Sequence, residues 1–395
     1  MEIKKHTADK EAVGTRFEKI NTALILCMFA FYTLTFFVPR FYGYTEKYVG
    51  LFVFVILAVM AVLNVNPVER LKAKDRDLIA LILIGVITPI NLLLVKSGYG
   101  CFFVVVNFAL IWYLSGIIKL SEKQFYVIGA IYTAMIIYWF FGVYTWMFAD
   151  YTSYAMNTNT AATFTVFSML CIMTFFDALC EKHKIAGLFV VMCLVKCLQI
   201  SLYHRSRGAF IMLGAFFVLR FIVPAGWWEI KWFYRAACIF ATLGSLLFVA
   251  VYIIVGTMGV NFRMPFFYKN IFSGREAIWL EFWNLFAHKP LTGIGTNVTI
   301  TSFFEFNVHN AMYNILVIHG VLVFVLTLYL MYRRWDKCRE GIASNRAARC
   351  ALCAILAVCI ESFFDVDLIW TNYSVNVLFL LLCMNSRFDA EGSDG

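Results

Sequence analysis

Ala236–Gly256 reads AACIFATLGSLLFVAVYIIVG, and none of its side chains carries a charge. A helix needs about 20 apolar residues to cross the hydrocarbon core of a membrane. Similar apolar runs recur along the chain, which is 62% hydrophobic and only 14% charged, whereas soluble domains carry about 25% charged residues. Lipid-exposed backbone cannot stay unpaired in a bilayer, so runs of this length must be helices. The sequence therefore predicts an all-α polytopic membrane protein with a single membrane domain over residues 1–395.

The apolar runs define about twelve transmembrane helices. We expect them near residues 20–38, 48–63, 78–95, 101–118, 125–148, 161–180, 185–202, 208–223, 236–256, 311–332, 348–363 and 370–384. Most loops between them are short, but residues 257–310 form one long polar and aromatic insert between the ninth and tenth spans. The first span follows a charged head without a small-residue cleavage site, so we interpret it as retained rather than as a cleaved signal.

The distribution of basic residues predicts the orientation. Twenty-two of the 33 lysines and arginines lie in the N-terminal head, the C-terminal tail or the loops on their side. The positive-inside rule then places the head (1–19) and the tail (385–395) in the cytoplasm and the insert (257–310) outside. We expect a multi-pass protein of the cytoplasmic membrane. Its net charge of +9 reflects this topology and contact with anionic membrane lipid, not nucleic acid.

A basic cluster opens the eighth span on the outer side. Arg205-Ser206-Arg207-Gly208-Ala209 places two arginines at a tight turn. Arginine suits phosphate because its planar fork donates two parallel hydrogen bonds and keeps its charge. Snorkelling toward the membrane surface is the alternative explanation. It predicts basic residues on every outer loop, yet residues 149–160 contain none. Arg207, and less strongly Arg205, are candidate anion ligands.

The insert supplies a third arginine. Gly274-Arg275 precedes a segment whose apolar residues follow a helical period through Phe286, which predicts an interfacial amphipathic helix. A glycine suits the start of such a helix, where backbone N–H groups favour phosphate oxygens. Arg275 is therefore a candidate ligand supported by Gly274, although a lid helix with an incidental arginine would look the same.

His309-Asn310 opens the tenth span. Histidine titrates near neutral pH and can take a proton from a hydroxyl, but it can also be a structural residue at a helix start. Lys196 lies within the seventh span, where a lysine is costly and usually faces a partner or a wet cavity. Pairing with Glu361 and a role at the substrate are both open for Lys196.

Two further patterns are weak. Cys350-x-x-Cys353 has metal or redox spacing but no second pair nearby, and packing explains it better. Asp365-Val-Asp367 matches a metal-binding D-x-D pair of soluble glycosyltransferases in only two loop residues.

Three motifs stand in a fixed order: Ser206-Arg207-Gly208-Ala209, then Gly274-Arg275 with His288-x-Pro290-Leu-x-Gly293-x-Gly295, then His309-Asn310 followed by Gly320. With the spans and the long outer insert, this order resembles the O-antigen ligase and polymerase family of bacterial envelopes. The resemblance covers roughly residues 200–325. It implies a membrane glycosyltransferase fold of the C type that needs no metal or other cofactor.

The same resemblance implies a reaction. Such enzymes move an undecaprenyl-diphosphate-linked oligosaccharide to an acceptor sugar hydroxyl on the outer face of the membrane, for O-antigen, lipopolysaccharide, capsule or exopolysaccharide. Arg207 and Arg275 would hold the diphosphate, with Arg205 as a further candidate, and His309 would be the catalytic base, supported by Asn310. The alternatives are a transporter or flippase of a lipid-linked glycan and a non-catalytic assembly subunit. Transporters often carry matched Gly- or Pro-broken spans, and we expect none here.

Overall fold

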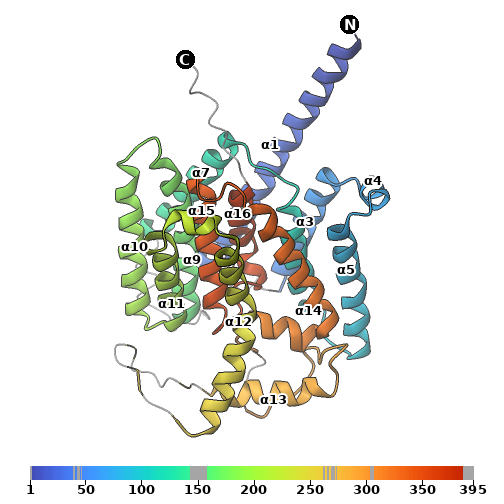
Figure 1. Ribbon diagram of the computed structural model, residues 1–395, viewed down its shortest axis with the longest axis vertical. Helices are drawn as coiled ribbons and strands as arrows, with labels where there is room; N and C mark the ends of the chain where they lie inside the picture. The colour runs from blue at the N-terminus through green and yellow to red at the C-terminus, as the bar shows by residue number, and fades with distance from the viewer. Residues whose placement is uncertain are drawn as a thin grey trace.

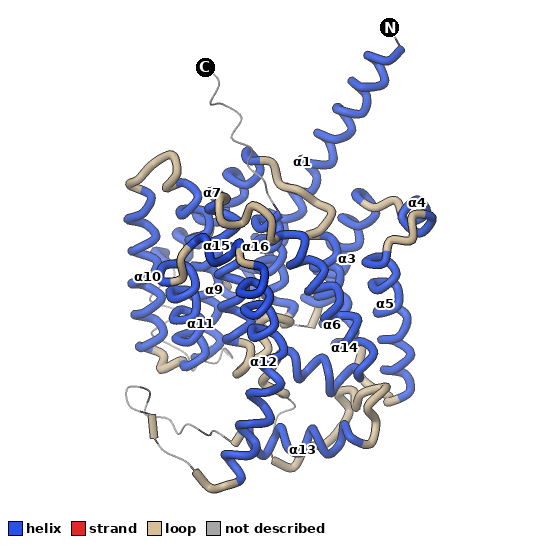
Figure 2. The backbone as a smooth tube through the Cα atoms, in the orientation of Figure 1, coloured by secondary structure: helices blue, strands red, loops and turns tan. Residues whose placement is uncertain are grey.

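The computed structural model of the chain is built from helices, and no strand occurs among the residues that it describes (Figure 2). Those residues are 2–38, 41, 45, 47–142, 158–260, 263, 264, 267, 272, 274–302 and 307–385. The α-helices are α1 (Glu2–Phe37), α3 (Val49–Asn64), α4 (Pro67–Lys72), α5 (Arg76–Leu94), α6 (Gly100–Leu114), α7 (Glu122–Gly142), α9 (Thr158–Leu179), α10 (Ala186–Tyr203), α11 (Arg207–Phe217), α12 (Lys231–Thr257), α13 (Arg275–Ala287), α14 (Ala311–Cys338), α15 (Arg346–Glu361) and α16 (Ser374–Asn385). A π-helical turn η1 (Val218–Ile222) and two 3-10 turns, η2 (Ala225–Glu229) and η3 (Thr371–Tyr373), complete them.

The helices fall where the apolar runs predict them. Each of the twelve expected spans overlaps an α-helix, although residues 143–148 of the fifth lie outside the described residues. Six helical segments in the described part are long and apolar enough to cross a membrane: 17–36, 76–94, 159–179, 186–203, 231–257 and 311–338. The prediction of a polytopic helical membrane protein is therefore confirmed at this level.

The arrangement of exposed apolar side chains suits a lipid environment. α15 and α16 lie at the centre of the bundle (Figure 1), and almost all of their side chains are buried. α5 and α10 lie at its edges and expose large apolar side chains such as Leu93 (78% exposed) and Val195 (62%). A helix that presents apolar side chains outward at this density is stable when lipid covers it.

The two ends of the bundle differ in what they carry. The start of α1 and the end of α16 lie at one end, beside α4, and α13 crosses the opposite end (Figure 1). We call these the terminal end and the α13 end.

Buried polar contacts tie central helices together. The Tyr32 hydroxyl lies 3.0 Å from Ser168 Oγ and accepts a hydrogen bond from Asn376 Nδ2 at 2.7 Å, and Asn376 Oδ1 accepts one from Tyr132. These contacts join α1, α7, α9 and α16. Side-chain hydrogen bonds of this kind fix the packing of membrane helices, for which apolar burial alone gives little drive.

Helix α14 is broken at Gly320, contrary to the expectation of unbroken spans. Gly320 has φ 85° and ψ 167°, and the turn 290–295 fills the break. Ile294 N donates to the carbonyl of Val317 at 2.8 Å, and Val321 N donates to that of Pro290 at 2.9 Å. The turn therefore satisfies backbone groups that the break would leave unpaired. A Gly-x-Gly turn far from Gly320 in sequence gives no local signal for this contact.

The break predicts a strict requirement for glycine. Gly320→Ala should lower the free energy of unfolding by at least about 2 kcal/mol, since its positive φ is strained for alanine and the new Cβ would overlap the carbonyl oxygen of Leu291. Thermal unfolding of the purified protein in detergent measures the effect. Gly85→Ala is the matched control, because a Cβ there meets no atom within 4 Å. Equal unfolding temperatures for the two variants would contradict the tight contact.

Candidate functional site

Helix α13 confirms the helix expected within the insert. Its Ncap residue is Gly274, with φ 84°, a left-handed conformation that glycine adopts without strain. One face of α13 is buried through Ile278, Trp279, Phe282 and Phe286, whereas Trp283 is half exposed. The Glu281 carboxylate accepts hydrogen bonds from the backbone N–H groups of Thr301 and Ser302. The helix is therefore anchored from both sides, and Arg275 is its first residue.

A turn fixed by α13 presents His309. The backbone N–H of His309 donates to Asn307 Oδ1 at 2.9 Å, and His309 has φ 51°. Trp279 Nε1 donates to the carbonyl of Val308 at 2.6 Å, and the Tyr313 hydroxyl donates to the carbonyl of Trp279 at 2.8 Å. A non-glycine residue with positive φ persists only where its surroundings over-determine it. The contacts from α13 provide that constraint.

Asn310 ties the start of α14 to two other helices. Its Oδ1 accepts from Tyr313 N at 2.9 Å, which caps α14, and from Ser245 Oγ of α12 at 2.7 Å. Its Nδ2 donates to the carbonyl of Phe363, just past the end of α15, at 3.0 Å. Asn310 is fully buried. Through these contacts Asn310 fixes the residue that precedes it, His309, against the loop that follows α15; its supporting role in a reaction stays a prediction.

A polar cavity of about 30 Å³ lies beside this turn. It is lined by Asn159, Thr163, Ser206, Arg207, Gly208, Arg275, Glu361, Phe364 and Asp365. These residues come from the starts of α9, α11 and α13 and from the end of α15 with its following loop. Helix starts carry partial positive charge and unpaired backbone N–H groups, which favour anions. Three of them meet at this cavity with two arginines.

The cavity brings together residues that the sequence only suggested separately. Arg207 and Arg275, 68 positions apart, line the same cavity. His309 Nδ1 lies 3.8 Å from Asp365 Oδ1, so the histidine adjoins the cavity through Asp365. Burial of Asp365 favours its neutral form, but contact with His309 and the charge of Arg275 outweigh burial and hold the pKa of this carboxyl below its ordinary value. Asp365 is therefore ionised at neutral pH.

Glu361 and Gly208 form the floor of the cavity. Glu361 is fully buried, and its Oε1 has no hydrogen-bond partner among the described residues. A Cβ at Gly208 would lie 2.8 Å from this oxygen. Ser206 Oγ accepts from the backbone N–H of Ala209 and caps α11. The Ser-Arg-Gly-Ala motif therefore combines a helix cap, a cavity arginine and a close approach to Glu361.

Residues of the 257–310 insert also contact Arg207 and another residue of α11. Arg207 Nη1 lies 3.9 Å from Met264 Sδ, and the rings of Phe210 and Phe267 meet edge to face at 5.5 Å. Arg207 is half-buried beneath these residues. Covering an arginine in this way strengthens its interaction with an anion, because water is partly excluded.

Two candidates from the sequence lie outside the described lining of this cavity. Arg205 is exposed, with φ 51°, two residues before the start of α11. Lys196 is half-buried on α10 and donates to Gln199 Oε1 at 3.1 Å. A supporting role of Lys196 at the site stays a prediction. Its suggested partner Glu361 faces Gly208 instead.

Asp365 is the site residue that sequence reasoning missed. The sequence offered it only as half of a weak metal-binding pair. The structure places it against His309 and within the field of Arg275. Its one sequence signal was its place in the loop 363–370, where Asp365 and Asp367 are the charged residues.

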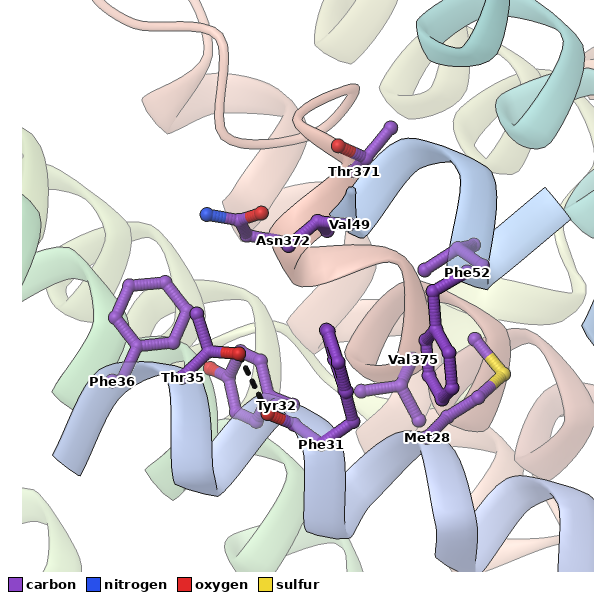
Figure 3. Close-up of a pocket in the computed structure, with 11 residues that line it drawn as sticks. Met28, Phe31, Tyr32, Thr35, Phe36, Val49, Phe52, Thr371, Asn372 and Val375 are labelled. Carbon is purple, nitrogen blue, oxygen red and sulfur yellow. Dashed lines mark hydrogen bonds between the residues drawn. The ribbon is translucent and has the colours of Figure 1, made fainter. Parts of the chain in front are cut away.

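A second cavity at the α13 end differs in character. It lies between α1, α3 and η3 and is lined mainly by apolar side chains such as Phe31 and Phe52 (Figure 3). The Thr35 hydroxyl in its wall turns back to the carbonyl of Phe31 at 2.8 Å (Figure 3). Its volume of about 10 Å³ is at the lower limit for one water molecule. This cavity is a packing gap rather than a substrate site.

Comparison with known proteins gives no family for the chain: no family model matches it, and no curated protein matches it.

The contacts of Asn310 predict a large effect of its removal. Asn310→Ala should destabilise the protein by roughly 2 kcal/mol or more, because it loses a helix cap and leaves buried groups unpaired. Asn66→Ala is the control, since Asn66 caps the short helix α4 at an exposed position and should cost about 1 kcal/mol or less. Thermal unfolding compares the two. A cost for Asn310→Ala no larger than that for Asn66→Ala would contradict the positioning role.

Proposed function

We propose that this chain is a membrane glycosyltransferase of the O-antigen ligase or polymerase type. It moves an oligosaccharide from an undecaprenyl-diphosphate carrier to an acceptor sugar hydroxyl. The observation that carries the proposal is the cavity that Arg207 and Arg275 share, with His309 and Asp365 at its edge. Surface polysaccharides such as O-antigen or capsule are the products that fit this chemistry.

Arg207 and Arg275 are the proposed ligands of the leaving group, the diphosphate of the carrier. As the bond from the sugar to the carrier breaks, negative charge grows on the diphosphate. Fixed guanidinium groups and helix starts stabilise charge that develops in the transition state. Two arginines from different helices, α11 and α13, can each donate a bidentate pair of hydrogen bonds to phosphate oxygens. No metal is invoked for this step.

His309 is the proposed base that takes the proton of the acceptor hydroxyl. The acceptor oxygen forms a bond to the anomeric carbon while the bond from that carbon to the diphosphate oxygen breaks, and the hydroxyl proton passes to His309. Asp365 Oδ1 lies 3.8 Å from His309 Nδ1, where a carboxylate can orient the imidazole, and we propose Nε2 as the nitrogen that takes the proton. The products are the new glycosidic bond and undecaprenyl diphosphate.

The topology proposed for this reaction has twelve spans, both termini in the cytoplasm and the 257–310 insert outside. The basic residues of the sequence support it through the positive-inside rule. The cavity at the α13 end then opens at the outer leaflet, where the carrier presents its glycan. The carrier, a glycan or lipid-linked acceptor and membrane lipid are the proposed partners.

A transporter or flippase of the same lipid-linked glycan is the second candidate. The break of α14 at Gly320 favours it, because discontinuous helices are common in transporters. The break is filled by the turn 290–295 of the same chain, and the hydrogen bonds across it hold it in one arrangement. A flippase also has no need for a histidine held against a carboxylate, and we therefore prefer the transferase.

The first test replaces each cavity arginine with lysine, which keeps the positive charge but cannot donate two parallel hydrogen bonds. Arg207→Lys and Arg275→Lys should each slow transfer about tenfold or more, since a lysine cannot make paired hydrogen bonds to one phosphate. Transfer is measured with membranes supplied with carrier-linked oligosaccharide. Lys289→Gln, an exposed change at the same end of the bundle, serves as control. Full activity in both lysine variants would count heavily against the proposal.

The second test uses cells. In a deletion strain, His309→Ala should lower transfer by about 10²–10⁴-fold, as loss of a general base does, whereas His288→Ala, an exposed histidine just past α13, should not. Surface glycan reduced to one repeat unit identifies a polymerase, and long carrier-linked chains that never reach their acceptor identify a ligase. Normal surface glycan in the His309→Ala strain would contradict the transferase proposal and favour the transporter.

A further inference from the structure

The terminal end of the bundle carries a second polar cavity. It has a volume of about 40 Å³ and is lined by Arg70, Asp77, Trp112, Tyr113, Gly116, Ile117, Leu330, Arg334 and Lys337. These residues come from α4, the start of α5, the end of α6 with the turn after it, and the last turns of α14. The reaction proposed above uses none of them.

Arg334 is the unusual residue of this cavity. It is only 3% exposed. Its guanidinium donates to Ser115 Oγ at 3.2 Å, to Asn385 Oδ1 at 3.5 Å and to the carbonyl of Leu381 at 3.3 Å. All three acceptors are neutral, and no carboxylate in the described part of the chain lies within ion-pair distance of Arg334. A buried charge that lacks a counter-charge is costly.

The nearby carboxylates are already engaged by other cations. Asp77 accepts from Lys337 Nζ at 2.5 Å and from Arg333 Nε at 3.2 Å. Asp75 pairs with Arg70 at 2.7 Å and also caps α5. The lining of the cavity holds three cations, Arg70, Arg334 and Lys337, and one carboxylate, Asp77. This excess of positive charge favours an anionic ligand.

A neutral donor points to the same ligand. The hydroxyl of Tyr113 is buried in the cavity wall, where its oxygen interacts with the guanidinium of Arg70. A guanidinium can only donate, and the Tyr113 O–H has no acceptor among the described residues. A phosphate oxygen in the cavity would supply that acceptor.

We propose that this cavity binds the phosphate group of an anionic ligand. Basic pockets between membrane helices on the cytoplasmic side bind anionic lipid headgroups, and the cavity lies among the basic loops of the terminal end. A phospholipid headgroup and a soluble phosphate share this chemistry. The site would fasten α4, α6 and α14 together at the end opposite the proposed reaction.

The experiment uses the purified full-length protein in neutral detergent. Phosphatidylglycerol, phosphatidylcholine and inorganic phosphate are added separately, and binding is followed by native mass spectrometry and by the unfolding temperature. Lys337→Gln and Arg334→Gln should each weaken binding of the phosphate ligand about tenfold, the effect of one charge-assisted hydrogen bond. Lys337 is half exposed, so its variant stays informative if Arg334→Gln does not fold.

Lys182→Gln is the matched control. Lys182 lies in the turn after α9, away from the cavity lining, and like Lys337 it pairs with a carboxylate, that of Glu122. It should bind like the wild type. Stabilisation by phosphatidylglycerol alone assigns the site to a lipid headgroup, and stabilisation by inorganic phosphate as well assigns it to a phosphate from either source. Equal binding of phosphatidylglycerol and phosphatidylcholine, with no effect of inorganic phosphate, would overturn the proposal. So would equal loss of binding in Lys337→Gln and Lys182→Gln.

Discussion

The hydrogen bonds between the turn 290–295 and the broken helix α14 are the constraint on which the α13 end depends. Inside a membrane protein a helix cannot stop without new partners for its backbone groups. Pro290, Ile294 and Gly295 provide those partners, and glycine at 293 and 320 lets the two backbones touch. This contact fixes the chain that follows α13, and α13 in turn holds the turn of His309 through Trp279.

Electrostatics explains why the two polar cavities lie where they do. At the α13 end, helix starts add positive potential to Arg207 and Arg275, and Asp365 offsets part of it while holding His309. At the terminal end, Arg334 meets the carbonyl of Leu381 near the end of α16, where the helix dipole favours a cation. Each cavity keeps a buried polar group with unused hydrogen-bonding capacity among the described residues: Glu361 Oε1 at one end and the O–H of Tyr113 at the other. Such atoms mark places where a ligand can add bonds that the folded chain lacks.

Much of the fold was predictable because the signals are local. A continuous apolar run specifies a helix in a membrane, and each expected span coincides with one. The start of α13 was predictable from Gly274, since its left-handed conformation suits glycine. The break at Gly320 was not predictable, because the partner that permits it lies about 26 residues away, a contact that sequence periodicity does not report. Likewise the role of Asp365 depends on its contact with His309, which lies far from it in the sequence. A lysine within a span suggests a buried partner, whereas Lys196 is half-buried and donates to Gln199 in its own helix, and its role stays a prediction.

The most direct test of the proposed transfer reaction follows the fate of one lipid-linked donor. Purified protein is placed in liposomes with an undecaprenyl-diphosphate-linked oligosaccharide and an acceptor glycan, and the products are resolved by mass spectrometry. The account predicts a new glycosidic bond together with released undecaprenyl diphosphate. A donor that crosses the bilayer intact, with no bond made, would contradict it.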